Sequence, residues 1–163
     1  MAELILESKI EEAFRSVIAG SVDAALTAGP VPVLVSLVYD ELATDHVCVV
    51  CKAISPTDVD GLQRSGHWDA EVEVKVVTDA AGRADSSGAA VDLRAVHTGR
   101  VKAVRDMLNV EGLTNLLDAT QSDFSVTGWK LGGAQQDMIG NSWVTRTTFI
   151  LIDATESNRE VLP

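Results

Sequence analysis

Two cysteines, Cys48 and Cys51, have the Cys-X-X-Cys spacing of zinc sites and thiol redox sites. The chain has no second pair, and both cysteines lie in a β-branched stretch that predicts a strand, in which residues three apart point to opposite faces. His46 and His67 are the nearest additional metal ligands, but they flank different predicted strands. We expect two small buried thiols, with a metal site as the alternative.

His97 and Arg100 both fall on the apolar side of a predicted helix. A histidine beside a cation is a possible general base, although such a histidine is more often a core residue satisfied by one backbone partner. The guanidinium of Arg100 must reach water, a carboxylate or a neighbouring chain. The sequence contains no nucleophile elbow, phosphate-binding loop, dinucleotide fingerprint or metalloprotease helix. We therefore predict no catalytic, cofactor or metal site.

Asp69, Glu71 and Glu73 alternate with apolar residues along one predicted strand, which places their carboxylates on one face at intervals of about 7 Å. Two paired carboxylates are the machinery of a glycosidase. A solvated strand face is the commoner cause of such a pattern. A third interpretation is that the three carboxylates line a channel.

Apolar periodicity defines the elements that must position these residues. Apolar side chains recur every three or four positions in helices expected over residues 4–18 and 92–108, and a shorter helix is expected over residues 110–117. β-branched residues predict strands over residues 33–39, 46–54, 67–78, 123–130 and 142–153. Stretches rich in glycine, proline or serine, residues 55–66, 80–90 and 131–141, are expected to be irregular loops. The core should take most of the aromatic residues Trp68, Phe124, Trp129, Trp143 and Phe149.

This order of elements predicts the α+β class, with a mixed, largely antiparallel sheet of about five strands and helices packed on one face. The chain has 163 residues, of which 46% are apolar, and this composition suits one domain over residues 1–153 with a flexible polar tail over residues 154–163. A net charge of −11 argues against binding to nucleic acid. No apolar run is long enough to span a membrane, and the acidic N-terminus argues against a signal peptide.

The layout resembles the tail terminator and neck (tail-completion) proteins of long-tailed bacteriophages. The resemblance covers residues 3–153 and is carried by the N-terminal helix, the helix HTGRVKAVRDML, the step GLTNLL and the closing strands FSVTGWKLGG and SWVTRTTFILID. It implies a virion protein without catalysis that closes into a hexameric ring, ends tail-tube growth and joins the tail to the head connector. Its implied partners are further copies of the chain, the tail tube protein and the head-tail connector protein. The resemblance also implies that DNA passes through the ring without specific binding, that assembly takes place in the host cytoplasm and that the protein then resides in the virion tail or neck.

A ring of this kind would use two features of the sequence. Asp69, Glu71 and Glu73 are candidates for the channel lining, because an acidic lining repels phosphates. The three loop stretches are expected to order against neighbouring subunits or the tube. The interface candidates are Arg64, Arg83, Arg100, Gln135, Gln136 and Asp137.

Three alternatives remain open from the sequence. The first is another ring protein of the neck or tail, either a head-tail connector or a tail tube protein. The second is a small cytoplasmic enzyme that uses His97 with a nearby carboxylate. The third is a ligand-binding module in which the sheet frames an apolar pocket.

Overall fold

A computed structural model describes residues 5–27, 31–35, 45–59, 61–79, 92–120, 124–140 and 142–156. Its helices are α1 (Leu6–Ala19), α2 (Ala24–Thr27), α3 (Leu93–Leu108) and α4 (Leu113–Thr120). Its strands are β1 (Val33–Val35), β2 (His46–Val59), β3 (Leu62–Asp79), β4 (Phe124–Ile139) and β5 (Ser142–Glu156). The strands form one sheet in the order β1-β2-β3-β5-β4, in which β1 is parallel to β2 and the other neighbours are antiparallel. The predicted α+β class and mixed sheet are confirmed.

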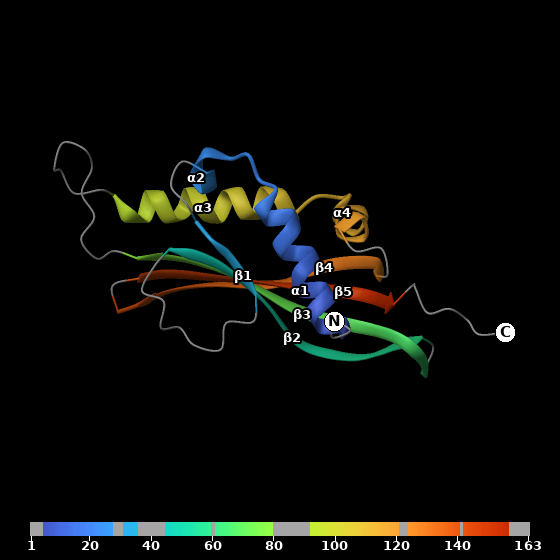
Figure 1. Ribbon diagram of the computed structural model, residues 1–163. Helices are drawn as coiled ribbons and strands as arrows, with labels where there is room; N and C mark the ends of the chain where they lie inside the picture. Colours follow the sequence, from blue (N-terminus) through green and yellow to red (C-terminus); the bar gives the residue numbers. More distant parts are fainter. Residues whose placement is uncertain are drawn as a thin grey trace.

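The helices form a single layer on one face of the sheet, as predicted (Figure 1). In the described part of the chain α1 packs on β1 and β2, α3 packs on β3 and β5, and α4 packs on β4. The other face carries no helix in Figure 1, and we call it the open face.

Local sequence signals account for the ends of the two long helices. The Asp92 carboxylate accepts a hydrogen bond from the Ala95 backbone N–H at 3.2 Å and so caps the start of α3. Gly20 follows the last residue of α1 and forms its C-cap. α4 begins three residues later than predicted, at Leu113, because Val110 accepts a turn hydrogen bond from the Leu113 N–H at 3.0 Å.

The core lies between the helices and the sheet. Its largest fully buried side chains include Phe14 and Ile10 of α1, Phe149 and Leu151 of β5 and Leu108 of α3. The ring centroid of Phe149 lies 5.8 Å from that of Phe14 and 5.8 Å from that of Trp129, so the two layers meet at Phe149. The side chain of Phe124 is outside the described part.

The irregular loop predicted for residues 55–66 is wrong, because β2 and β3 continue through it as a hairpin. Val59 pairs with Leu62, and Gly61 has a φ of 77°, which a turn residue without a side chain adopts freely. Pro56 has no N–H to donate to the strand pairing, and it lies at the register shift between Pro56 and Asp58, where that pairing is interrupted.

The loop predicted for residues 131–141 is also wrong. β4 runs on to Ile139, which pairs with Ser142 across a two-residue turn, and Gly140 has a φ of 59° in that turn. A register shift between Leu131 and Gly133 accommodates the glycine pair as a bulge, with a φ of 143° at Gly133. The glycine pair therefore forms a bulge within β4 and does not begin a loop.

Strand β5 extends into the range predicted as a flexible tail. Ala154 is fully buried and pairs with Val126, and β5 ends at Glu156. Residues 157–163, the predicted loop at 80–90 and the end of the strand predicted at 33–39 lie outside the described residues.

Candidate functional site

His97 is held inside the protein by two strands. Its ring Nδ1 lies 2.8 Å from the Thr78 hydroxyl of β3, and its Nε2 lies 2.7 Å from the Thr145 hydroxyl of β5. The side chain has no exposed surface. The core interpretation of this histidine is therefore confirmed, with two hydroxyl partners in place of the expected backbone group.

Arg100 lies one helical turn after His97 and finds a carboxylate, one of its three predicted partners. Its Nη1 donates to Asp45 Oδ2 at 2.6 Å and to the Thr78 hydroxyl at 3.3 Å. Asp45 also accepts a hydrogen bond from the Asp79 backbone N–H at 2.8 Å. The side chains of Arg100 and Asp45 are both 8% exposed, so this pair joins α3 to the ends of two strands inside the subunit.

Burial, with a smaller contribution from the positive charge of Arg100, lowers the pKa of His97 to about 4. A histidine with this pKa is neutral at pH 7 and a weak base. The nearby carboxylate, that of Asp45, is engaged by Arg100. His97 therefore has a structural role, in which its ring nitrogens join α3 to β3 and β5.

The lowered pKa makes stability depend on pH. The unfolded chain binds a proton at His97 below about pH 6.5, whereas the folded chain binds it only near pH 4, so acidification through this window favours unfolding. We expect protonation of His97 alone to lower the free energy of unfolding by about 3 kcal/mol between pH 7 and pH 4. In urea denaturation series, the loss of stability over this range should be smaller by that amount in His97→Gln than in the unchanged protein. Equal losses would contradict the assignment.

Cys48 and Cys51 lie on opposite faces of β2, as predicted. In the sheet register Cys48 is opposite Lys75 of the open face, and Cys51 is opposite Val72 of the core face. Burial, followed by the nearby charges of Glu11 and Glu7, raises the pKa of the Cys51 thiol to about 12. A thiol of this kind is a poor nucleophile at neutral pH.

The three aligned carboxylates have different environments. Asp69 accepts hydrogen bonds from the Thr57 hydroxyl at 2.9 Å and from the Asp153 backbone N–H at 3.0 Å. Glu73 pairs with Lys52 at 3.2 Å and with Arg146 at 3.7 Å. Glu71 is exposed.

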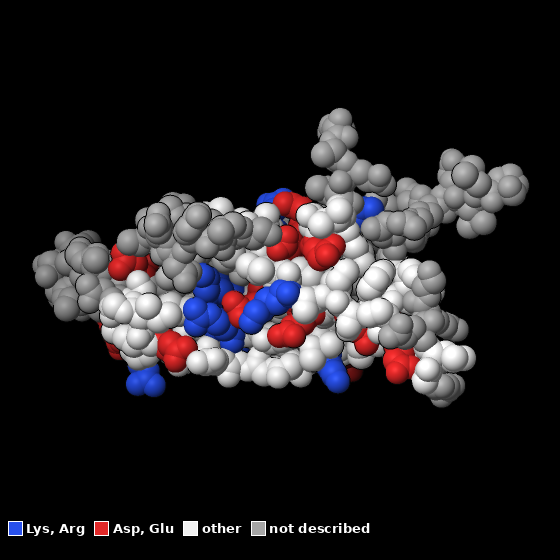
Figure 2. Space-filling view, turned by 90° about the horizontal axis from the view of Figure 1, so that it is seen from below, with Lys and Arg blue, Asp and Glu red and all other residues white. Residues whose placement is uncertain are grey.

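The open face therefore has mixed charge within an acidic protein. Figure 2 views this face and shows a group of Lys and Arg atoms near its middle, with Asp and Glu atoms among them. Among the described side chains, Lys and Arg on this face are Lys75, Lys130 and Arg146 by register, and Lys52 by its ion pair with Glu73. Lys75 follows Glu73 by two residues on the same strand, but Lys52, Lys130 and Arg146 come from three other strands, and the sequence could not reveal that the fold places them on this face.

The structure brings three of the interface candidates together on β4. Gln135 and Gln136 are exposed, Gln135 donates to Asp137 at 3.0 Å, and Asp137 lies 3.5 Å from Arg146. Arg100 is separate from them and buried, as described above. Arg64 lies in β3, but its side chain is outside the described part, and Arg83 is outside the described residues.

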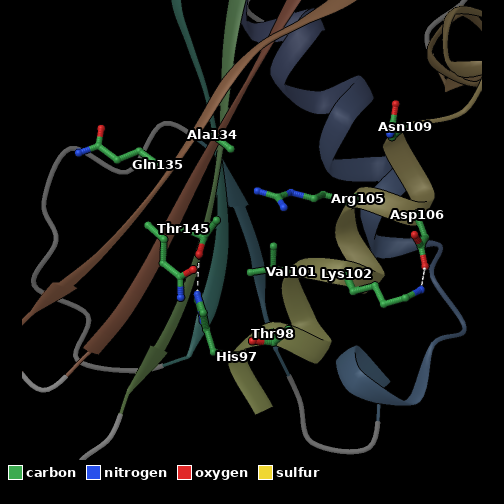
Figure 3. A pocket seen from close by; sticks show the side chains of 11 residues that line it. His97, Thr98, Val101, Lys102, Arg105, Asp106, Asn109, Ala134, Gln135 and Thr145 are labelled. Atoms are coloured by element: carbon green, nitrogen blue, oxygen red, sulfur yellow. Dashed lines mark hydrogen bonds and ion pairs between the residues drawn. The ribbon is translucent and has the colours of Figure 1, made fainter. Parts of the chain in front are cut away.

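A groove of about 590 Å³ separates α3 from the second half of β4 (Figure 3). Residues of its helical wall include Thr98, Val101, Lys102 and Arg105, and those of its sheet side include Ala134, Gln135, Gln136 and Thr145. We call it the α3–β4 groove. In Figure 3 the Arg105 side chain extends from α3 toward the strands, whereas Lys102 turns back to Asp106 on its own helix.

Sequence reasoning missed the groove and Arg105. Arg105 follows Val104 and precedes Leu108 by three residues, so it borders the apolar stripe of α3, and that position was the available signal. The sequence does not show which strand Arg105 faces, because that depends on where α3 lies across the sheet.

Comparisons with known proteins give a structural likeness. No protein-family model matches the chain, and no curated protein matches its sequence. Among the described residues no helix is long and apolar enough to cross a membrane. A chain in the solved structure entitled "Virion of native gene transfer agent (GTA) particle" is 14% identical and superposes with a TM-score of 0.59, covering 93% of this chain and 99% of that one. The two proteins share a fold over almost their whole lengths.

Proposed function

We propose that this protein is a structural component of a phage-like virion. The observation that carries the proposal is the likeness in fold to a chain of a virion particle, which spans 93% of one chain and 99% of the other. The neutral, fully buried His97 and its hydroxyl partners support a role without catalysis.

Within the virion, we propose the role of tail terminator. The chain would close into a ring, hexameric by the resemblance in sequence, that ends growth of the tail tube and presents its other side to the head connector. Its partners would be its own copies, the tail tube protein and the head-tail connector protein, with assembly in the host cytoplasm and residence in the tail or neck. DNA would pass through the ring without specific binding.

Asp69, Glu71 and Glu73 remain our proposal for the channel lining, with unequal contributions. Glu73 is paired with two cations, whereas Asp69 accepts hydrogen bonds from neutral donors and keeps its charge, so Asp69 and Glu71 would carry most of the repulsive charge. Gln135, Gln136 and Asp137 remain proposed interface residues.

The experiment adds the purified protein to a tail tube protein during polymerisation and measures tube lengths by negative-stain imaging. A terminator is expected to shorten the tubes in proportion to its concentration and to add one ring at one end. A tail tube protein would instead polymerise by itself into long tubes, and a connector would form rings that leave tube length unchanged. A chain that forms no ring and binds no tube end would refute a role in the neck or tail.

A further inference from the structure

The helical layer leaves the second half of β4 uncovered. α4 packs on β4, whereas α3 packs on β3 and β5, and the α3–β4 groove separates α3 from this part of the strand. Met138 of this half is 54% exposed and lies on the groove side, in line with Gln136 and Ala134, whereas the neighbouring Ile139 lies on the open face. Met138 is therefore available to a partner that enters the groove.

The same half of β4 has an open backbone edge. β4 is the last strand in the sheet order, so its side away from β5 has no neighbouring strand among the described residues. Proteins commonly protect such edges with proline, lysine or a bulge. Residues 134–139 contain no proline or lysine, and the only register shift in the β4–β5 pairing, between Leu131 and Gly133, lies before them. This edge is therefore suited to pairing with another extended segment.

Arg105 supplies a cation to the groove. Its side chain is half-buried, and its Nη2 donates to the Thr147 hydroxyl at 3.4 Å. Among the described residues no carboxylate pairs with it, whereas Arg100, Lys102 and Arg146 each have one. A half-buried guanidinium in a chain with 24 acidic and 13 basic residues is an electrostatically favourable place for an incoming carboxylate.

We propose that the α3–β4 groove and the edge of β4 receive a second copy of this chain. An extended segment of the neighbour pairs with residues 134–139, its side chains cover Met138, and one of its carboxylates binds Arg105. Local charge complementarity favours this occupant, because each copy has 24 acidic and 13 basic residues and can offer a carboxylate to the guanidinium of Arg105. The contact is head-to-tail, since the groove and the acidic segment are different surfaces, and such contacts form rings when the rotation between subunits closes. The inference rests on the proposed function, which requires a ring.

Sedimentation velocity over a concentration series, with the chain alone and with tail tubes, tests the contact through three variants. Arg105→Glu replaces the attraction for the neighbour's carboxylate by repulsion, and Met138→Lys places a charge where the neighbour's side chains cover Met138. Each is expected to raise the concentration needed for assembly at least tenfold. Lys130→Glu makes the same change of charge as Arg105→Glu on the open face of β4, and it should stay within twofold of the unchanged protein. Circular dichroism checks that each variant is folded.

Hydrogen exchange supplies the second measurement, because a paired edge protects its backbone amides. We expect slower exchange in residues 134–139 on assembly. The groove contact is wrong, and the proposed ring stands, if the chain assembles without slower amide exchange in residues 134–139 and if Arg105→Glu and Met138→Lys assemble like the unchanged protein. Protection that arises only on tubes, with subunits bound singly, would make the tube protein the occupant and overturn the inference. If the chain is monomeric under all conditions, both the proposed ring and the groove contact are wrong. If rings form through the groove but tube length does not change, only the terminator role is wrong.

Discussion

Replacing Asp45 by alanine is expected to lower the free energy of unfolding by about 3–5 kcal/mol. The change leaves the guanidinium of Arg100 in an interior site without its carboxylate, and it also removes the acceptor of the Asp79 backbone N–H. Removal of one partner of a buried ion pair costs more than the pair contributes, because the remaining charge cannot be solvated. Urea denaturation monitored by circular dichroism measures the effect.

Asp106→Ala is the matched control. Asp106 also pairs with a cation, Lys102, at 2.5 Å, but the side chains of this pair are 74% and 60% exposed. Water replaces the lost partner there, so the unfolding midpoint should change little. A loss below about 1 kcal/mol in Asp45→Ala would mean that water reaches Arg100, and it would contradict the buried pair.

Replacing Phe149 by alanine is the second large change, with an expected loss of about 3–5 kcal/mol. The side chain is completely buried and contacts Phe14 of α1 and Trp129 of β4, so its removal opens a cavity between the two layers. Protein interiors are closely packed, and the rigid sheet limits collapse of that cavity. Urea denaturation gives the loss of stability, and tryptophan fluorescence reports the altered surroundings of Trp129.

Ile152→Ala on the same strand tests whether position in the strand or burial causes the loss. Ile152 is 36% exposed, and its truncation should cost about 1 kcal/mol or less. Similar losses in the two variants would indicate that β5 is destabilised by any shortened side chain, and would contradict the central packing role of Phe149.

The sequence predicted the fold class and the two long helices because those signals are local. The acidic cap at Asp92 and the apolar spacing of α1 act within a few residues of one another. The sequence patterns wrongly predicted loops where the β2–β3 and β4–β5 hairpins lie. Pro56 and the pair Gly132–Gly133 are breakers in an isolated strand, and only pairing with a neighbouring strand lets a bulge absorb them.

The sequence by itself determined which residues needed partners. Arg100 on an apolar helix face required a carboxylate, water or another chain, and His97 required satisfied ring nitrogens. Only the tertiary structure decided that Asp45, 55 residues away, and the hydroxyls of two strands meet those needs. It alone also decided that Arg105 faces a groove at an open strand edge. The physical reason is that burial and periodicity are local properties of a chain, whereas the partner of a charge depends on how helices are placed across the sheet.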